Sequence, residues 1–318
     1  MHPEHLQTCV RSRDRLARLG AKASTVAAVL LAGVLWGLGL CAHAQEPPVD
    51  PAAALQSQRI ALQSQLRASA FGTPLLLSSR DASSQFEGEV HAEIAHSFAD
   101  VTAAFKSAAT VCELLFLHLN ARACHPASTA EGEALTLTIG PKRAQDSDLR
   151  HQLRYAMRVE ATTPAYFRVT LHAARGPLGT RDYRIVFEAV PIDARHCFVR
   201  MGYAYRTGAL ARIAMDAYLA TAGRAKIGFT VTGQDEAGRP VLVNGERAAL
   251  ERNVIRYVLA LMAYSSAKTG TPQEQTEARL RTWFALTERY AAQLHELRLE
   301  EYLQEKHNDL ASNALGPS

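Results

Sequence analysis

The sequence predicts an α+β protein in which helices cover one face of an antiparallel sheet. Apolar and polar residues alternate in six segments between residues 89 and 205, which is the pattern of strands with one buried face. Turn signals such as Gly176-Pro177 separate these segments and favour an antiparallel meander. Apolar residues at helical spacing follow the first strand and return after residue 245, so we expect the helices to pack against that sheet.

The N-terminus has the pattern of a cleavable secretory signal over residues 1–44. An uncharged apolar run from 26 to 40 ends in Ala42-His43-Ala44. This run is shorter than the roughly 20 residues needed to span a bilayer. We therefore expect cleavage near Ala44 and a periplasmic or secreted protein, with a retained anchor and acylation of Cys41 as alternatives. The basic residues that precede the run are Arg11, Arg13, Arg15, Arg18 and Lys22.

Removal of this segment changes the charge of the protein. Residues 1–44 hold five basic and two acidic residues, so they account for +3 of the net charge of +4. The remaining chain is nearly neutral and has no basic tract, so it lacks the electrostatic surface that nucleic acids require. We expect no nucleic-acid partner and only transient contact with membranes.

The rest of the chain is expected to divide into four segments. Prolines at 47, 48 and 51 precede a stretch of helical composition, which predicts a linker and a short N-terminal helix over residues 45–86. The α+β domain covers residues 87–268. A long C-terminal helix over residues 269–308 and a disordered tail over residues 309–318 complete the chain.

Within the domain, the first strand leads directly into a helix that ends near Asn120. Ser97 and Asp100 resemble a capping box at the start of this helix. The later strands are centred on residues 135–139, 153–159, 167–173, 183–189 and 199–205. They are followed by a helix over residues 209–222, a hairpin that pairs residues 227–232 with 241–244, and a helix from 245 to 267.

The C-terminal helix has the clearest start. Thr271-Pro272-Gln273-Glu274 forms a capping box with proline at the first helical position. A helix from there to Lys306 would be about 50 Å long, which exceeds the width of a compact domain of this size. We therefore expect it to kink, to overhang the sheet or to pair with a protein partner through its apolar face, which includes Trp283 and Leu294.

Three cysteines remain after removal of the signal. Cys112 lies at the end of a predicted helix and Cys124 just past it, so a local disulfide is geometrically feasible in an oxidising compartment. The alternative is that Cys112 is a small buried apolar residue. Cys197 lies in a predicted strand and is expected to be a buried free thiol.

No catalytic or metal-binding motif is recognisable. His91 and Glu93 share one face of the first strand, but His96 points to the other face, so the three do not meet at one metal ion. His295-Glu296 begins like a zinc-protease motif, yet Leu299 stands where the second histidine is required. We expect no catalytic residues, no metal and no cofactor.

The order of these elements resembles the START-like or helix-grip (SRPBCC) superfamily. The resemblance extends from Gly88 to about Ala222 and rests on Gly88-Glu89-Val90 leading into Phe98-Ala99-Asp100-Val101, then on Cys112-Glu113-Leu114-Leu115. It implies a curved antiparallel sheet that wraps a long helix and encloses an apolar cavity. The family normally ends with the closing helix, whereas this chain continues beyond residue 222. Either the helix near residues 249–267 closes the sheet, or the later helices are an addition.

The resemblance implies that the protein binds or carries a hydrophobic, lipid-like small molecule between sheet and helix. Arg256 and Tyr257 are candidates for holding the polar head of that ligand. Two alternatives remain: an interaction protein that acts through its C-terminal helix, and a cyclase-like or hydrolase-like enzyme on the same fold. The candidate walls, which form a packed core if no cavity exists, are Tyr155, Met157, Phe167, Val169, Leu171, Phe187, Met201 and Tyr203.

Overall fold

The computed structural model describes residues 50–314, apart from residue 83 and the segments 142–148, 210–211, 214–216 and 218–225. The predicted signal and most of the predicted helix over residues 209–222 lie outside the described residues. Among the helices that are described, none is long and apolar enough to cross a bilayer.

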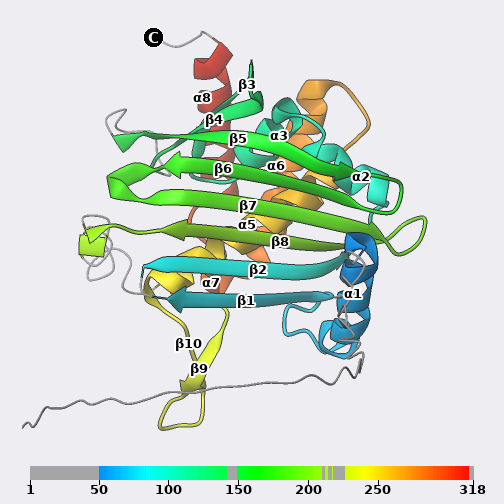
Figure 1. Ribbon diagram of the computed structural model, residues 1–318. Helices are drawn as coiled ribbons and strands as arrows, with labels where there is room; N and C mark the ends of the chain where they lie inside the picture. Colours follow the sequence, from blue (N-terminus) through cyan, green and yellow to red (C-terminus); the bar gives the residue numbers. More distant parts are fainter. Residues whose placement is uncertain are drawn as a thin grey trace, which may run out of the picture. The chain divides into compact units, whose positions relative to one another are not determined.

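Eight antiparallel strands form one sheet in the order β1-β2-β8-β7-β6-β5-β4-β3 (Figure 1). This confirms the predicted α+β class with a meandering sheet. Two short strands, β9 (Val231–Gln234) and β10 (Pro240–Leu242), form the predicted hairpin outside it. The strands of the large sheet are β1 (Leu75–Ala82), β2 (Gln85–Ile94), β3 (Ala121–Thr129), β4 (Gly132–Ile139), β5 (His151–Thr162), β6 (Phe167–Arg175), β7 (Arg181–Pro191) and β8 (Cys197–Arg206).

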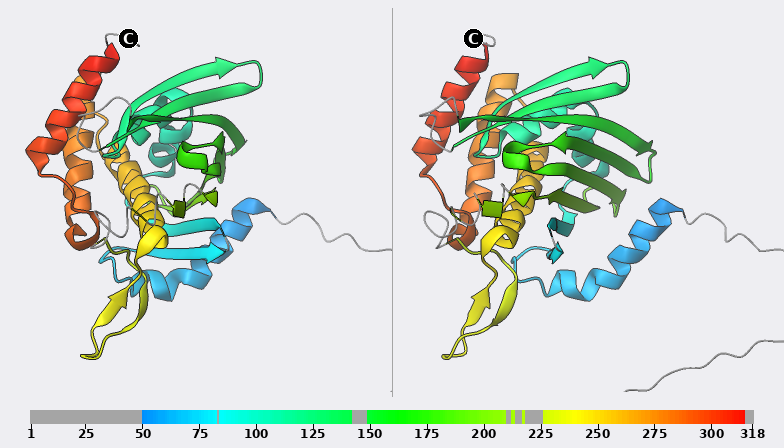
Figure 2. Two further views of the ribbon diagram at one scale, coloured as in Figure 1. Left: turned by 90° about the vertical axis from the view of Figure 1, so that its left-hand side faces the viewer. Right: turned by 60° about the vertical axis from the view of Figure 1, so that its left-hand side comes forward.

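The helices of the central and C-terminal parts lie on one side of this curved sheet, as Figure 2 shows from two directions. Helix α1 instead packs across one end of the strands, where Leu55 and Leu66 meet Tyr166 and Phe198 in a small separate cluster. The helices are α1 (Pro51–Arg67), α2 (Phe98–Thr102), η1 (Ala103–Phe105), α3 (Ala108–Phe116), η3 (Pro177–Gly179), α5 (Gly245–Ser266), α6 (Pro272–Glu288), α7 (Ala291–Leu294) and α8 (Leu299–Ala314).

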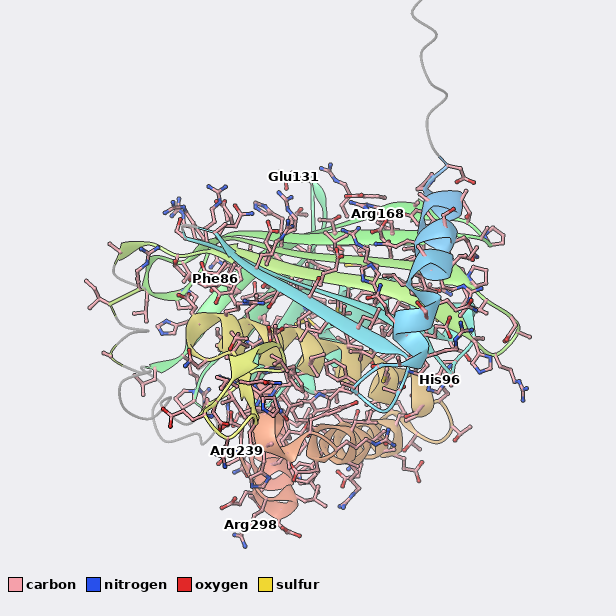
Figure 3. All side chains as sticks on the ribbon, turned by 90° about the horizontal axis from the view of Figure 1, so that it is seen from below. Phe86, His96, Glu131, Arg168, Arg239 and Arg298 are labelled. Atoms are coloured by element: carbon pink, nitrogen blue, oxygen red, sulfur yellow. A yellow bond between two sulfur atoms is a disulfide. The ribbon has the colours of Figure 1, made fainter. Side chains whose placement is uncertain are left out.

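The two faces of the sheet differ because the strand sequences alternate. In β5, Leu153, Tyr155 and Met157 are buried, whereas Arg154 and Arg158, which alternate with them, are exposed. Figure 3 shows Glu131 and Arg168 on the face that is turned away from the helices. The apolar face therefore meets the helices and the charged face meets water.

Helix α5 lies against the apolar face and is the helix that the sheet wraps. Its central residues, including Val254, Ile255 and Val258, are completely buried. Gly88 of β2 lets the helix approach closely, because a Cβ atom at this position would lie 3.3 Å from side-chain atoms of Leu250 and Val254. The predicted helix from 245 to 267 is confirmed, and it closes the sheet although it is not the last element of the chain.

The predicted C-terminal helix over residues 269–308 is not continuous, because the chain breaks into α6, α7 and α8. Of the three expected alternatives, the kink is the one that the structure shows. Tyr290 leaves the helical conformation, and its hydroxyl donates to the carbonyl of Phe71 at 2.9 Å. The carbonyl of Leu294 accepts from Nη2 of Arg256 at 3.2 Å instead of from a helical N–H. Tyr290 thus ties the break to the segment before β1, and Arg256 satisfies a carbonyl at the end of α7. Helix α8 folds back beside α6.

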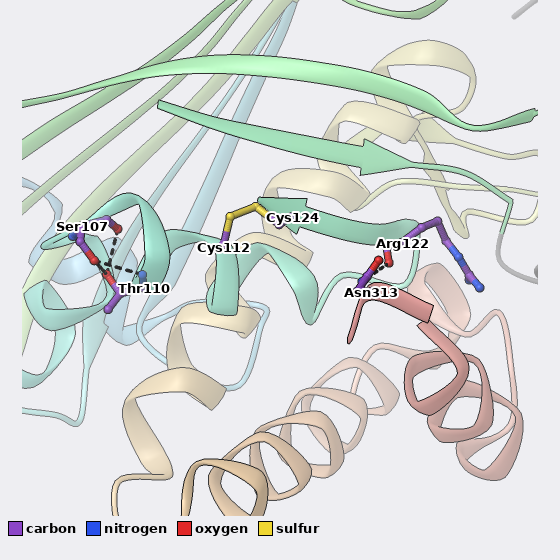
Figure 4. Close-up of a disulfide and its surroundings, with 6 residues drawn as sticks. All are labelled: Ser107, Thr110, Cys112, Arg122, Cys124 and Asn313. Atoms are coloured by element: carbon purple, nitrogen blue, oxygen red, sulfur yellow. Dashed lines mark hydrogen bonds between the residues drawn. A yellow bond between two sulfur atoms is a disulfide. The ribbon is translucent and has the colours of Figure 1, made fainter. Parts of the chain in front are cut away.

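The predicted disordered tail is also corrected in part. Residues 309–314 belong to α8, and residues 315–318 lie outside the described part of the chain. The physical reason is burial of a polar cluster: Asp309 is 3% exposed and binds Nη2 of Arg122 at 2.9 Å. Asn313 then donates to the backbone carbonyl of Arg122, as Figure 4 shows.

A buried lysine also attaches α8 to the loop after α3. The Nζ atom of Lys306 donates to the carbonyls of His118 and Ala121, at 2.8 and 2.6 Å. It lies 4.3 Å from the centre of the Phe116 ring. Burial lowers the pKa of this ammonium group, and Asp309 opposes that shift. Helix α8 is therefore held by polar contacts to the strand and loop beneath it.

Two edge strands and one helix break were absent from the sequence prediction. The segment expected to hold a linker and short helix, residues 45–86, contains β1, which buries only Leu75 and so shows no alternation. Strand β3 buries only its first three residues. The helix expected to run from 97 to 120 is interrupted, because Ser107 and Thr110 form a second capping box that starts α3.

A disulfide joins Cys112 of α3 to Cys124 of β3, with the two Cα atoms 5.2 Å apart (Figure 4). The bridge closes the loop that leads from α3 into β3. Cys197 is a buried free thiol, and burial raises the pKa of that thiol to about 12.

Candidate ligand-binding site

A cavity of about 440 Å³ lies between one end of the sheet and the first half of α5. This volume falls in the range of small-molecule sites. Two exposed leucines stand among its lining residues, Leu149 at 55% and Leu178 at 50% exposure. The lining residues come from the loop after α3 (His118, Asn120, Ala121), from β4 and the segment after it (Leu137, Ile139, Gly140, Pro141), from β5 and the residues before it (Leu149, His151, Leu153), from η3 and its C-cap (Pro177, Leu178, Thr180), from β7 and β8 (Tyr183, Tyr203, Tyr205) and from α5 (Glu246, Ala249, Asn253, Tyr257).

Four tyrosine rings form one wall of the cavity. Tyr183 stacks on Tyr205 with ring centres 5.3 Å apart. Tyr203 lies 5.8 Å from Tyr205 and meets Tyr257 of α5 edge to face at 5.7 Å. They come together because β7 and β8 are neighbours and α5 crosses over them. Such a wall offers flat apolar surface with polar hydroxyls at its edges.

The four hydroxyl groups are not equivalent. Tyr183 donates to Oγ1 of Thr180 at 2.9 Å, and Tyr205 donates to Glu246 at 3.4 Å. The hydroxyls of Tyr203 and Tyr257 have no hydrogen-bond partner among the described residues. Burial raises the pKa of both phenols well above the ordinary value, so both keep their protons at neutral pH.

His118 lines the cavity and is only 5% exposed. Its Nδ1 accepts from the backbone N–H of Asn120 at 3.1 Å, which assigns the proton of the neutral ring to Nε2. Burial, assisted by Arg256 and Lys306, lowers the pKa of His118 well below its ordinary value. The Asn253 side chain opposes this shift, but no described group reaches Nε2 with hydrogen-bond geometry. The imidazole is therefore neutral at pH 7.

The charge of the lining is low. Among the described residues that line the cavity there is no lysine or arginine, and Glu246 is the acidic member. No group of three or more histidine, cysteine or acidic residues in the described part of the chain could hold a metal ion.

Only some of the predicted wall residues line the cavity in the structure. Tyr203 and Tyr257 line the cavity. Arg256 is turned to the other side of α5, where it binds Glu296 at 3.2 Å. The others are buried in the core without lining the cavity: Tyr155, Met157, Phe167, Val169, Leu171, Phe187 and Met201.

The core residues lie where another side chain fills the space between sheet and helices. The ring of Phe105 stacks on that of Phe187 with centres 4.1 Å apart. At the other end, α5 contributes the small side chain of Ala249 and leaves a cavity. His118 and Asn120 were missed as site residues, since they follow the end of a helix and belong to no periodic pattern.

Fold and site together define an α+β protein of helix-grip architecture with a cavity lined in part by aromatic rings. No family model and no curated protein matches the chain. Among solved structures, it is similar to a START superfamily protein from Mycobacterium smegmatis (11% identity, 46% of this chain and 92% of that one, TM-score 0.28). It is similar to human StAR-related lipid transfer protein 5 (9%, 53% and 89%, TM-score 0.29) and to the Zhui aromatase/cyclase from a Streptomyces species (11%, 65% and 94%, TM-score 0.32).

Proposed function

We propose that this protein binds and carries a hydrophobic, lipid-like small molecule in the cavity between the sheet and α5. The observation that carries the proposal is a half-open cavity of about 440 Å³ whose walls are largely apolar and aromatic. A packed core of the same composition would leave no such space. The exposed Leu149 and Leu178 give an entering ligand an apolar surface.

Filling the cavity is expected to abolish binding. Ala249→Phe adds a phenyl ring at a half-buried position of α5 that lines the cavity. We expect native mass spectrometry of the protein from a periplasmic extract to show a bound apolar compound in the wild type. The variant should carry at least tenfold less of it.

The matched control is Ala53→Phe, which adds the same ring on an exposed position of α1. It should retain the compound at the wild-type level. An empty wild-type protein that also binds no neutral fluorescent dye would overturn the proposed function.

We propose that the protein acts in the periplasm or outside the cell. The signal pattern of residues 1–44 supports export, and a disulfide is typical of proteins in oxidising compartments. The intact mass of the protein from the periplasmic fraction should correspond to a chain that begins at Gln45. A full-length mass in the cytoplasmic fraction would contradict export.

Catalysis in the same cavity is the second candidate function. It is favoured by His118, because its neutral imidazole carries the proton on Nε2, which has no described acceptor and can donate a hydrogen bond to a substrate oxygen that gains negative charge. The compound recovered from the wild type distinguishes the two functions. A carrier releases it unchanged after prolonged incubation, whereas an enzyme converts it and a His118→Asn variant does not.

A further inference from the structure

The hydroxyls of Tyr203 and Tyr257 are two hydrogen-bond donors on neighbouring rings of the cavity wall. Neither has a partner among the described residues, and neither belongs to the fully enclosed polar atoms. Both phenols are protonated at neutral pH because burial disfavours the phenolate. An acceptor atom inside the cavity would satisfy both groups.

A carbonyl oxygen suits this pair, because it has two lone pairs and can accept from two donors at once. The two rings meet edge to face with centres 5.7 Å apart, and Tyr257 adds to the effect of burial in raising the pKa of Tyr203, so the two phenols are neighbours in the wall. A ligand that only donates hydrogen bonds would use the phenol oxygens as acceptors and leave the two phenol protons unpaired.

The described lining disfavours strongly charged ligands. It includes no lysine or arginine, and of its two histidines the deeply buried His118 is neutral, so a carboxylate or phosphate would meet no buried cation in this part of the wall. The rings of Tyr183, Tyr203, Tyr205 and Tyr257 favour a flat ring system over a flexible chain, because stacked and edge-to-face contacts require an aromatic or planar partner.

We propose that the ligand is a neutral ring compound whose carbonyl oxygen accepts hydrogen bonds from Tyr203 and Tyr257. This inference rests on the proposed function and names its substrate class. It assigns a binding role to two hydroxyl groups that the fold does not use.

Two neutral naphthalene dyes of similar size test the inference. Prodan carries a carbonyl oxygen, whereas N-phenyl-1-naphthylamine carries an N–H donor and no carbonyl. We expect Tyr203→Phe and Tyr257→Phe each to weaken prodan binding by about twofold to tenfold, the factor of one neutral hydrogen bond. Binding of the amine dye should change by less than about twofold, since it does not use the phenol protons.

Tyr290→Phe is the matched control, because it removes a tyrosine hydroxyl that donates to the carbonyl of Phe71 and does not line the cavity. It should leave the affinity for both dyes unchanged. Equal losses for both dyes in the Tyr203 and Tyr257 variants, or no loss for prodan, would overturn the inference while the carrier function stands. If neither dye binds to the wild type and no compound is recovered from it, the carrier function fails as well.

The infrared carbonyl band of bound prodan gives a second test. In the wild type it should lie at lower frequency than in an apolar solvent, because hydrogen bonds weaken the C=O bond. The band should shift back in a Tyr203→Phe/Tyr257→Phe double variant. An unshifted band in the wild type would show that the carbonyl meets no donor and would refute the assignment.

Discussion

Arg122→Met is expected to lower the free energy of unfolding by about 3–5 kcal/mol, the usual cost of breaking a buried ion pair. Arg122 and Asp309 are 2% and 3% exposed, and Nη2 of Arg122 lies 2.9 Å from the Asp309 carboxylate. Removal of the guanidinium leaves this carboxylate buried without its nearest cation. Glu305, the second carboxylate bound to Arg122, is partly exposed and can turn to water. Urea unfolding followed by circular dichroism measures the loss.

The matched variant is Arg122→Met/Asp309→Leu, which removes both charges and keeps apolar volume in place. Part of the lost stability should return, because replacing both members of a buried pair by apolar residues is often neutral. The recovery is incomplete, since Lys306 keeps its two carbonyl acceptors but loses the carboxylate that favours its charge. A double variant that is as unstable as Arg122→Met would show that the uncompensated charge of Asp309 is not the cause.

The loss of unfolding free energy in Arg122→Met should also depend on pH. Burial raises the pKa of Asp309 to about 6 even with Arg122 present, and Lys306 and Arg122 oppose that shift. Without Arg122 the pKa of Asp309 rises further. At about pH 6 and above, the folded variant therefore binds more protons than the folded wild type. The difference in unfolding free energy between variant and wild type should therefore be smaller at pH 5 than at pH 8.

Removal of the disulfide is expected to lower the free energy of unfolding by about 3 kcal/mol, the cost associated with a closed loop of roughly this length. Cys112 and Cys124 are 12 residues apart, and the bridge ties α3 to β3. The variant Cys112→Ala/Cys124→Ala tests this in thermal or urea unfolding.

A reducing agent provides the matched comparison. It should destabilise the wild type by a similar amount and leave the double alanine variant unchanged, because Cys197 is buried and takes part in no bridge. Wild-type stability that is the same with and without reductant would contradict a stabilising bridge.

The outline of the sheet could be predicted because its inner strands have one buried and one exposed face. Leu153, Tyr155 and Met157 alternate with exposed residues, and this pattern survives in the folded protein. Edge strands β1 and β3 could not be predicted, because most of their side chains are exposed or polar. Their pairing comes from backbone hydrogen bonds to the adjacent strand. Because backbone groups are the same in every residue, this pairing leaves no pattern in the sequence.

The C-terminal region was mispredicted for a related reason. The sequence from Pro272 to Lys306 suits a continuous helix, but a straight helix could not bury Leu294, Leu297 and Tyr302 together against the domain. Breaking at Tyr290 places all three in the core. The apolar face that favoured a protein partner is thereby covered by the chain's own residues.

Sequence alone determined the fold class of this protein and the inward set of strand residues, because burial on one face imposes a period that can be read directly. It left open which helix closes the sheet. Only the tertiary structure decided which inward residues surround a space. Phe105 fills one end against Phe187, while Ala249 leaves the other end open. A cavity wall and a packed core have the same residue pattern, and what separates them is the size of the side chain that comes from a distant element.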